Sequence, residues 1–258
     1  MLRLRPIVIS SLALLCLFGL WWLAGALHWA SAFLLPPPAK VWATFLSLCQ
    51  SGKLQSHMLV SLGRVGGGFA LALVSALVIS IFVSNSKIFA AIIEPPLEFL
   101  RQLPPLALIP LMLLWLGIGE AQKLGIIVMA SFFPIYLGFR GGFAQVDPKL
   151  IEVGRAAGFT RLALLRRIAL PAALPSIITG LRLGLGYGWR ALVGAELIAS
   201  SAGLGYLILD AQDLARTDIV LVGVFVIGII GVLTDNCLKA LVRWRLPWIA
   251  QDLELGHG

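Results

Sequence analysis

Charged side chains are scarce in this sequence. Asp, Glu, Lys and Arg make up only 12% of its 258 residues, whereas soluble chains average about 25%. Hydrophobic residues make up 59%, and the mean hydropathy is +0.96. These values exclude an ordinary soluble domain and favour an all-α protein that crosses a membrane several times. The net charge of +8 does not indicate a nucleic-acid site, because membrane proteins gather Lys and Arg in cytoplasmic loops.

Cysteine and histidine are scarce as well. Cys16, Cys49 and Cys237 have no CxxC or zinc-ligand spacing, which favours packing thiols over a disulfide or a metal site. The three histidines have no neighbours that would complete a metal site or a catalytic triad. No G-x-x-x-x-G-K-[ST] phosphate loop is present, so the chain does not bind ATP by that route. Any uphill transport must draw its energy from a partner or an ion gradient.

Long apolar runs are abundant, and they predict six transmembrane helices. The first run could instead be a cleaved signal peptide, but it is longer than the usual core of about 7–15 residues. It also ends in Trp21 and Trp22, which suit a membrane interface, so we expect it to be retained. The expected spans cover residues 7–27, 58–84, 88–117, 122–139, 172–199 and 218–241.

Three regions depart from this pattern. Proline at residue 38 opens a short segment, Pro38–Leu48, that predicts an amphipathic helix on the membrane surface. Three groups of prolines, at 95–96, 104–105 and 110, are expected to interrupt the third span, which is tolerated where the backbone is buried in protein or lines a watery cavity. Residues 200–216 are expected to form a polar loop. We divide the chain into an N-terminal part (1–56), a core transmembrane domain (57–245) and a cytoplasmic tail (246–258).

The distribution of Lys and Arg indicates the orientation. Six spans place both termini on one side, and that side collects twelve basic residues against five on the other. The positive-inside rule therefore predicts that both termini are cytoplasmic. The segment 147–171 then lies in the cytoplasm as well.

This segment, DPKLIEVGRAAGFTRLALLRRIALP, is rich in charged residues and lies between two long apolar runs. Asp147 and Pro148 predict a helix start, and Gly158 predicts its end. Thr160 can cap a second short helix, which Pro171 is expected to stop. A helix of about ten residues is marginal alone in water, so we expect a separate protein to hold it.

The same segment resembles the EAA signature of ABC importer permeases. That pattern reads E-A-A, three residues, G, nine residues, I-x-L-P, and Glu152, Gly158 and the I-x-L-P residues are in register. Val153 and Gly154 stand where the family has two alanines. The resemblance implies that a partner ATPase binds here, and its implied coupling residues are Glu152, Val153, Gly154, Ala157, Gly158, Ile168, Leu170 and Pro171.

Further motifs are similar to those of the permease subfamily for sulfonates, taurine, nitrate and thiamine-precursor pyrimidines. They are Leu34–Pro38, Ser61–Val65, Glu94–Pro96, Leu100–Pro104, Trp115–Glu120, Gly203–Tyr206 and Thr217–Asp218. The resemblance implies a type I importer permease (MetI-like) fold in the bacterial inner membrane. It also implies a homodimer, two cytoplasmic ATPase subunits and an extracytoplasmic binding protein. The permease would bind no cofactor, since the ATPase uses ATP and Mg.

Within this interpretation, the helix from Pro148 to Ala157 would lie in a groove of the ATPase. Gly154 and Ala157 would leave room for close approach. Glu152 would offer its charge to the partner or pair with Arg155 in its own helix. Gly158 would allow the sharp exit toward the second helix.

Ionisable residues at membrane depth are costly and usually face the bundle interior. They suggest a path for an anion lined by Arg101, Gln102, Arg182, Arg190 and Glu196. The alternative is structural: Arg101 would pair with Glu98 and Arg190 with Glu196, or the side chains would snorkel to an interface.

Aliphatic sulfonates or taurine are the first expectation for the substrate, and nitrate or a pyrimidine precursor the second. A different class, the ion-coupled secondary transporter, would predict inverted repeats and acidic relays within spans. The sequence shows no convincing repeat, and its glutamates in spans cluster in one proline-broken helix.

Overall fold

The computed structural model describes residues 4–27, 29, 31 and 33–248. Over these residues the chain is helical and contains no strand, which confirms the all-α prediction. The elements are α1 (Leu4–Ala26), α2 (Pro38–Gln50), α3 (Lys53–Asn85), α4 (Lys87–Gln102), the 3₁₀ turn η1 (Pro105–Leu108), α5 (Ile109–Leu116), α6 (Glu120–Ala144), α7 (Pro148–Ala156), α8 (Arg161–Leu164), the π turn η2 (Leu165–Ala169), α9 (Leu170–Ile198), α10 (Leu204–Asp213) and α11 (Thr217–Arg245).

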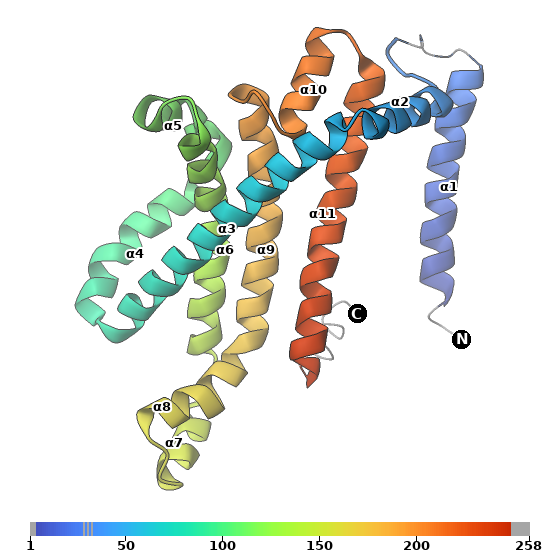
Figure 1. Ribbon diagram of the computed structural model, residues 1–258. Coiled ribbons are helices and arrows are strands. Elements are labelled where there is room, and N and C mark those ends of the chain that lie inside the picture. Colours follow the sequence, from blue (N-terminus) through green and yellow to red (C-terminus); the bar gives the residue numbers. More distant parts are fainter. Residues whose placement is uncertain (1–3, 28, 30, 32, 249–258) are drawn as a thin grey trace.

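The centre of the bundle is the pair α6 and α9, which run side by side (Figure 1). Glycines face each other across this contact. A Cβ on Gly138 would lie 2.9 Å from the Cα of Gly180, and a Cβ on Gly180 would lie 2.6 Å from the carbonyl oxygen of Pro134. Small residues let helices approach closely in lipid, where packing rather than hydrophobicity drives their association. The glycines therefore set the distance between the two central helices.

Helix α3 packs on the same pair of helices, and a glycine again allows the close approach. A Cβ on Gly68 would lie 2.6 Å from a side-chain carbon of Ile127 in α6. The glycine-rich start of α3 thus packs closely against α6 at this position.

The span count agrees with the prediction only in part. Among the residues that the structure describes, four helices are long and apolar enough to cross a membrane: α3, α6, α11 and one continuous helix from Arg161 to Ile198. A fifth crossing results if α4 and the segment Pro105–Leu116 count together, although they meet at 95°. In α1 the described apolar stretch is the shorter Leu15–Ala26.

Three local predictions were wrong. Pro171 does not stop a helix, because the π turn η2 joins α8 to α9 without a break. Prolines 95 and 96 lie inside α4 rather than ending it, and the chain bends after Gln102. Residues 204–213 form helix α10 instead of a polar loop, because apolar residues such as Leu204 and Leu207 bury one face of it.

A buried ion pair ties the ends of four helices together at the side of the molecule that carries α10. Arg64 of α3 is 7% exposed, and Glu196 of α9 is 0% exposed. Their side chains meet at 2.7 Å, and Arg64 also contacts Glu120 at the start of α6 through two bonds of 2.6 and 2.7 Å. We call Ser61, Arg64, Glu120 and Glu196, with the backbone of 202–205, the polar node.

The node also holds the turn into α10. The backbone N–H of Gly205 donates to Glu196 (2.9 Å), and that of Leu204 donates to the Ser61 hydroxyl (2.9 Å). Ser61 in turn donates to Glu196. Gly203 has φ +116°, and a Cβ there would lie 2.2 Å from a carboxylate oxygen of Glu196. Glycine is therefore required where the turn passes the carboxylate.

The α6–α9 contact predicts that Gly180→Ala destabilises the protein by about 1–3 kcal/mol, the usual cost of overpacking. The added methyl would meet backbone atoms, which move less easily than side chains. Gly186→Ala in the same helix is the matched control, because a Cβ there meets nothing within 4 Å. Thermal unfolding of both purified variants in detergent measures the difference. Equal stabilities would contradict the role given to the glycine contact.

The polar node predicts that Glu196→Gln costs about 3 kcal/mol, because removing one partner of a buried pair leaves the other charge poorly compensated. Glu120→Gln should cost less, since Glu120 is 59% exposed and Arg64 keeps Glu196, although the buried Lys123 loses its ion pair with Glu120. Denaturant unfolding of the two isosteric variants checks the order. A larger loss at Glu120 would contradict this assignment.

Candidate functional site

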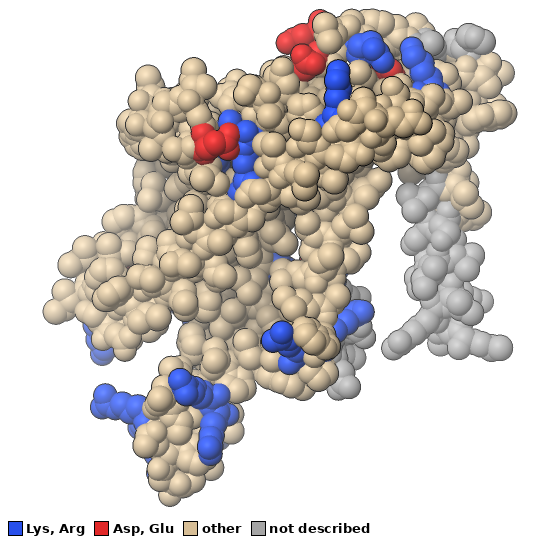
Figure 2. All heavy atoms as spheres, in the orientation of Figure 1, with Lys and Arg blue, Asp and Glu red and all other residues tan. Residues whose placement is uncertain are grey.

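The segment 147–171 protrudes from one end of the bundle as α7 and α8 (Figure 1). Lys and Arg side chains cover this end, as Figure 2 shows. Asp147 accepts a bond from the N–H of Lys149 (2.8 Å), and Thr160 accepts one from that of Ala163 (3.3 Å). Gly158 has φ +79°. The predicted N-cap, second cap and glycine stop are all confirmed.

The outer face of α7 is open. Glu152 and Ala157 are exposed, and Val153 is 67% exposed. The expected pairing of Glu152 with Arg155 is not formed, since no ion pair joins these two described residues.

Gly154 has a different place from the one expected. It is buried, and a Cβ there would lie 2.5 Å from the Cδ1 of Ile168 and 2.6 Å from the Cδ2 of Leu164. The missing side chain thus lets α7 fold back on the chain's own second helix. The sequence suggested room for a partner, because the spacing alone does not show which neighbour comes close.

The π turn η2 explains how the loop joins the membrane helix. Pro171 has no N–H, so an ordinary turn would lack a hydrogen bond here and its ring would crowd the preceding carbonyl. The five-residue π turn just before it accommodates this change in a continuous helix. Ile168 is half-buried within the turn, and Leu170 and Pro171 begin α9.

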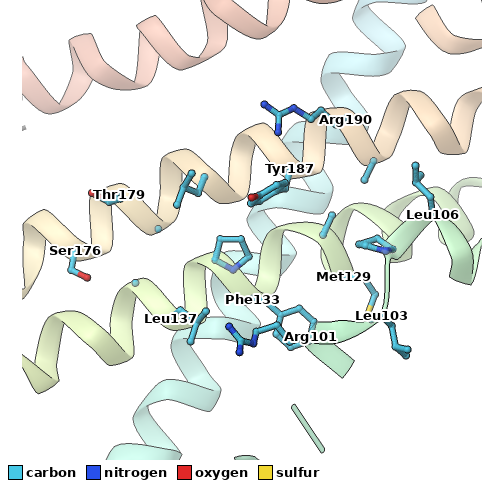
Figure 3. A pocket seen from close by; sticks show the side chains of 17 residues that line it. Arg101, Leu103, Leu106, Met129, Phe133, Leu137, Ser176, Thr179, Tyr187 and Arg190 are labelled. Carbon is cyan, nitrogen blue, oxygen red and sulfur yellow. The ribbon is translucent and has the colours of Figure 1, made fainter. Parts of the chain in front are cut away.

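A cavity of about 670 Å³ opens along α6, α9 and η1. Its lining is mostly apolar, with Arg101, Tyr187 and Arg190 among its polar members. In Figure 3 Arg101 lies beside Phe133 and Arg190 lies beyond Tyr187, so the two arginines lie on opposite sides of the labelled lining residues. No acidic side chain is among the described residues that line it.

Of the five residues suggested for an anion path, the structure brings only Arg101 and Arg190 to this cavity. Gln102 is exposed, with its amide 3.4 Å from Glu98. Arg182 contacts Asp235 of α11 at 3.0 Å, and Glu196 belongs to the polar node. The burial of the last two is accounted for by structural partners.

The alternative pairings have mixed outcomes. Arg101 does pair with Glu98, as expected. Arg190 does not pair with Glu196; its guanidinium carbon lies 5.7 Å from the ring centre of Tyr187, a cation–π distance.

Several α9 residues that line the cavity were not predicted from the sequence. Ser176, Thr179, Leu183 and Tyr187 line it beside the predicted Arg190, and these five recur every three or four residues, which places them on one helix face. This periodicity was a usable signal, although it does not tell a cavity from a packed core. Among the described residues no cluster of His, Cys, Asp and Glu is placed to hold a metal ion.

Comparison with known proteins identifies the family. The family described as "Binding-protein-dependent transport system inner membrane component" matches residues 65–246. The chain is 39% identical over 232 residues to a protein named "Putative aliphatic sulfonates transport permease protein SsuC" from Bacillus subtilis (strain 168). That match covers 90% of this chain and 84% of the relative. A second relative, "Taurine transport system permease protein TauC" from Escherichia coli (strain K12), is 36% identical over 249 residues, covering 95% and 90%.

Among solved structures, the chain resembles one titled "Crystal structure of an amino acid ABC transporter with histidines". The TM-score is 0.62 at 19% identity, with 78% of this chain and 96% of the other covered. This likeness shows the importer permease fold. Together with the family match over most of the chain, it establishes that the protein belongs to the inner-membrane permease components of binding-protein-dependent ABC transport systems, whose ATPase is a separate subunit.

Proposed function

We propose that this permease carries aliphatic sulfonates across the bacterial inner membrane into the cytoplasm. The observation that carries the proposal is the 670 Å³ cavity, with an apolar lining and arginines at its edges. An aliphatic sulfonate has an anionic head for a guanidinium and a short apolar tail for such walls. A relative at 39% identity is named for aliphatic sulfonates, which supports the same substrate class.

Taurine is the second candidate, because another relative is named for its transport. Its ammonium group calls for a carboxylate. The 670 Å³ cavity has no carboxylate among its described lining residues. Glu94 and Glu98 line a smaller neighbouring chamber, and Arg101 lines both spaces.

The assembly we propose contains two copies of this chain, two ATPase subunits and an extracytoplasmic binding protein. The permease would bind no cofactor, and the ATPases would use ATP and Mg. Both termini would be cytoplasmic, together with α7 and α8. In support, α1 begins and α11 ends on the side of the molecule where α7 and α8 protrude (Figure 1), and Lys and Arg gather over that loop.

The coupling would run through one continuous helix. It begins at Arg161 in the protruding loop and ends at Ile198. The same helix carries Tyr187 and Arg190 at the cavity. Glu152, Val153 and Ala157 would contact the ATPase, while Gly154 and Ile168 fix α7 to the base of this helix. Closure of the ATPase dimer would thus move a cavity wall directly, as a coupling of two sites requires.

Substitution at Gly158 tests the coupling. Gly158→Val should reduce ATP-driven uptake at least tenfold with normal membrane insertion, because a β-branched residue is a genuine outlier at φ +79°. Gly158→Asn should retain much of the uptake, since Asn tolerates this region. Uptake by proteoliposomes containing the assembled complex measures both. Normal uptake by Gly158→Val would count against the coupling role.

Uptake by the reconstituted complex tests the substrate. We expect ATP-dependent uptake of labelled ethanesulfonate, and weaker uptake of taurine, because only the former needs no carboxylate. Arg190→Gln should lower ethanesulfonate uptake about tenfold, the loss of one charged hydrogen-bond partner. Transport of nitrate alone, or of a neutral pyrimidine alone, would contradict the aliphatic sulfonate assignment.

A further inference from the structure

A second, smaller chamber lies beside the cavity and has no role in the function described so far. It has a volume of about 390 Å³ between α4 and α6. Arg101, Phe133 and Leu137 line both spaces. The two are therefore adjacent, and the guanidinium of Arg101 stands where they meet.

The chamber is lined by two ion pairs. Glu94, Glu98 and Arg101 follow one another at spacings of four and three residues, so they share one face of α4. Glu98 pairs with Arg101 in the same helix. Glu94 pairs across to Arg140 of α6, whose guanidinium also contacts the Tyr136 hydroxyl at 3.2 Å.

Arg190 of the larger cavity differs from these two arginines. It makes no ion pair with any described residue, and its guanidinium lies over the ring of Tyr187. Arg190 and Arg140 also lie at different heights. Arg190 is twenty residues beyond Leu170, about 30 Å along α9 from the protruding loop, whereas Arg140 lies four residues, about 6 Å, from the end of α6 next to that loop.

This arrangement resolves a physical difficulty. An unpaired arginine binds an oxyanion more strongly than one that already holds a carboxylate, and a bound anion that cannot leave blocks transport. A carboxylate already on the arginine reduces the net attraction by competing for the same N–H groups. Glu98 is 58% exposed and Arg101 is 40% exposed, and pairs this exposed are weak, so a substrate anion can displace Glu98.

We propose that Glu98 is an internal counter-ion that the transported anion displaces from Arg101. Glu94 serves the same purpose for Arg140, the next arginine along the path. The anion would pass from Arg190 to Arg101 and then to Arg140. It leaves each paired arginine because the glutamate returns. This inference rests on the proposed import of an anion.

Glu98→Gln tests it in the permease–ATPase complex, held in nanodiscs without a binding protein. Equilibrium binding of labelled ethanesulfonate should tighten about two- to fivefold, since an exposed pair of this kind has been removed. Maximal uptake by the full transporter should fall, because release becomes slower. Asp213→Asn, an exposed carboxylate on α10 away from both spaces, is the control and should change neither value.

The double variant Glu98→Gln/Arg101→Gln shows whether the effect passes through Arg101. It should bind ethanesulfonate as weakly as Arg101→Gln alone. Glu94→Gln is a separate single variant that removes the carboxylate from Arg140, and it should also tighten ethanesulfonate binding. Unchanged or weaker binding by both single glutamate variants would overturn the inference, as would a gain that persists without Arg101. If the wild-type complex binds no anion at all, the proposed anion import fails with it.

Discussion

The buried pair of Arg64 and Glu196 is the constraint on which the arrangement of the helices depends. Each charge has lost water, and each is compensated only when α3, α6, α9 and the turn into α10 are all in place. Such pairs add little net stability compared with an apolar contact, but separating them is costly. The node therefore specifies one arrangement of the four helix ends more than it stabilises them.

In the coupling proposed above, this constraint would fix one end of α9 while the other end is moved by the ATPase. At the fixed end the polar node holds α9 through Glu196. At the other end the same helix continues without interruption into the protruding loop, through the π turn before Pro171. Glycines along the α6–α9 contact remove the side chains that would otherwise interlock the two helices. In the proposed coupling, a force on the loop would tilt α9 about the node, and the cavity lies along α9 between the loop and the node.

The sequence predicts this division of the molecule in part. Periodicity and caps predict α2, α7 and the limits of most spans, because these signals lie within about ten residues of each other. Ser61, Glu120 and Gly203 each stand in a recognisable motif, but nothing in the sequence shows that the motifs meet. Their contacts join residues up to 146 positions apart. For the same reason Arg182 and Glu196 were assigned to a path: charge at membrane depth indicates a buried partner without saying which.

The charges within the bundle thus fall into two classes that composition alone cannot separate. In the polar node the bonds are many, short and shielded from solvent, so an added anion would have to displace several partners at once. Arg190 makes no ion pair with a described residue, and Arg101 shares one exposed carboxylate. In the proposed transport path, only charges of this second class would have attraction left for a substrate. Burial with several partners would then distinguish the charges that hold the fold from the incompletely paired ones that bind and release an anion.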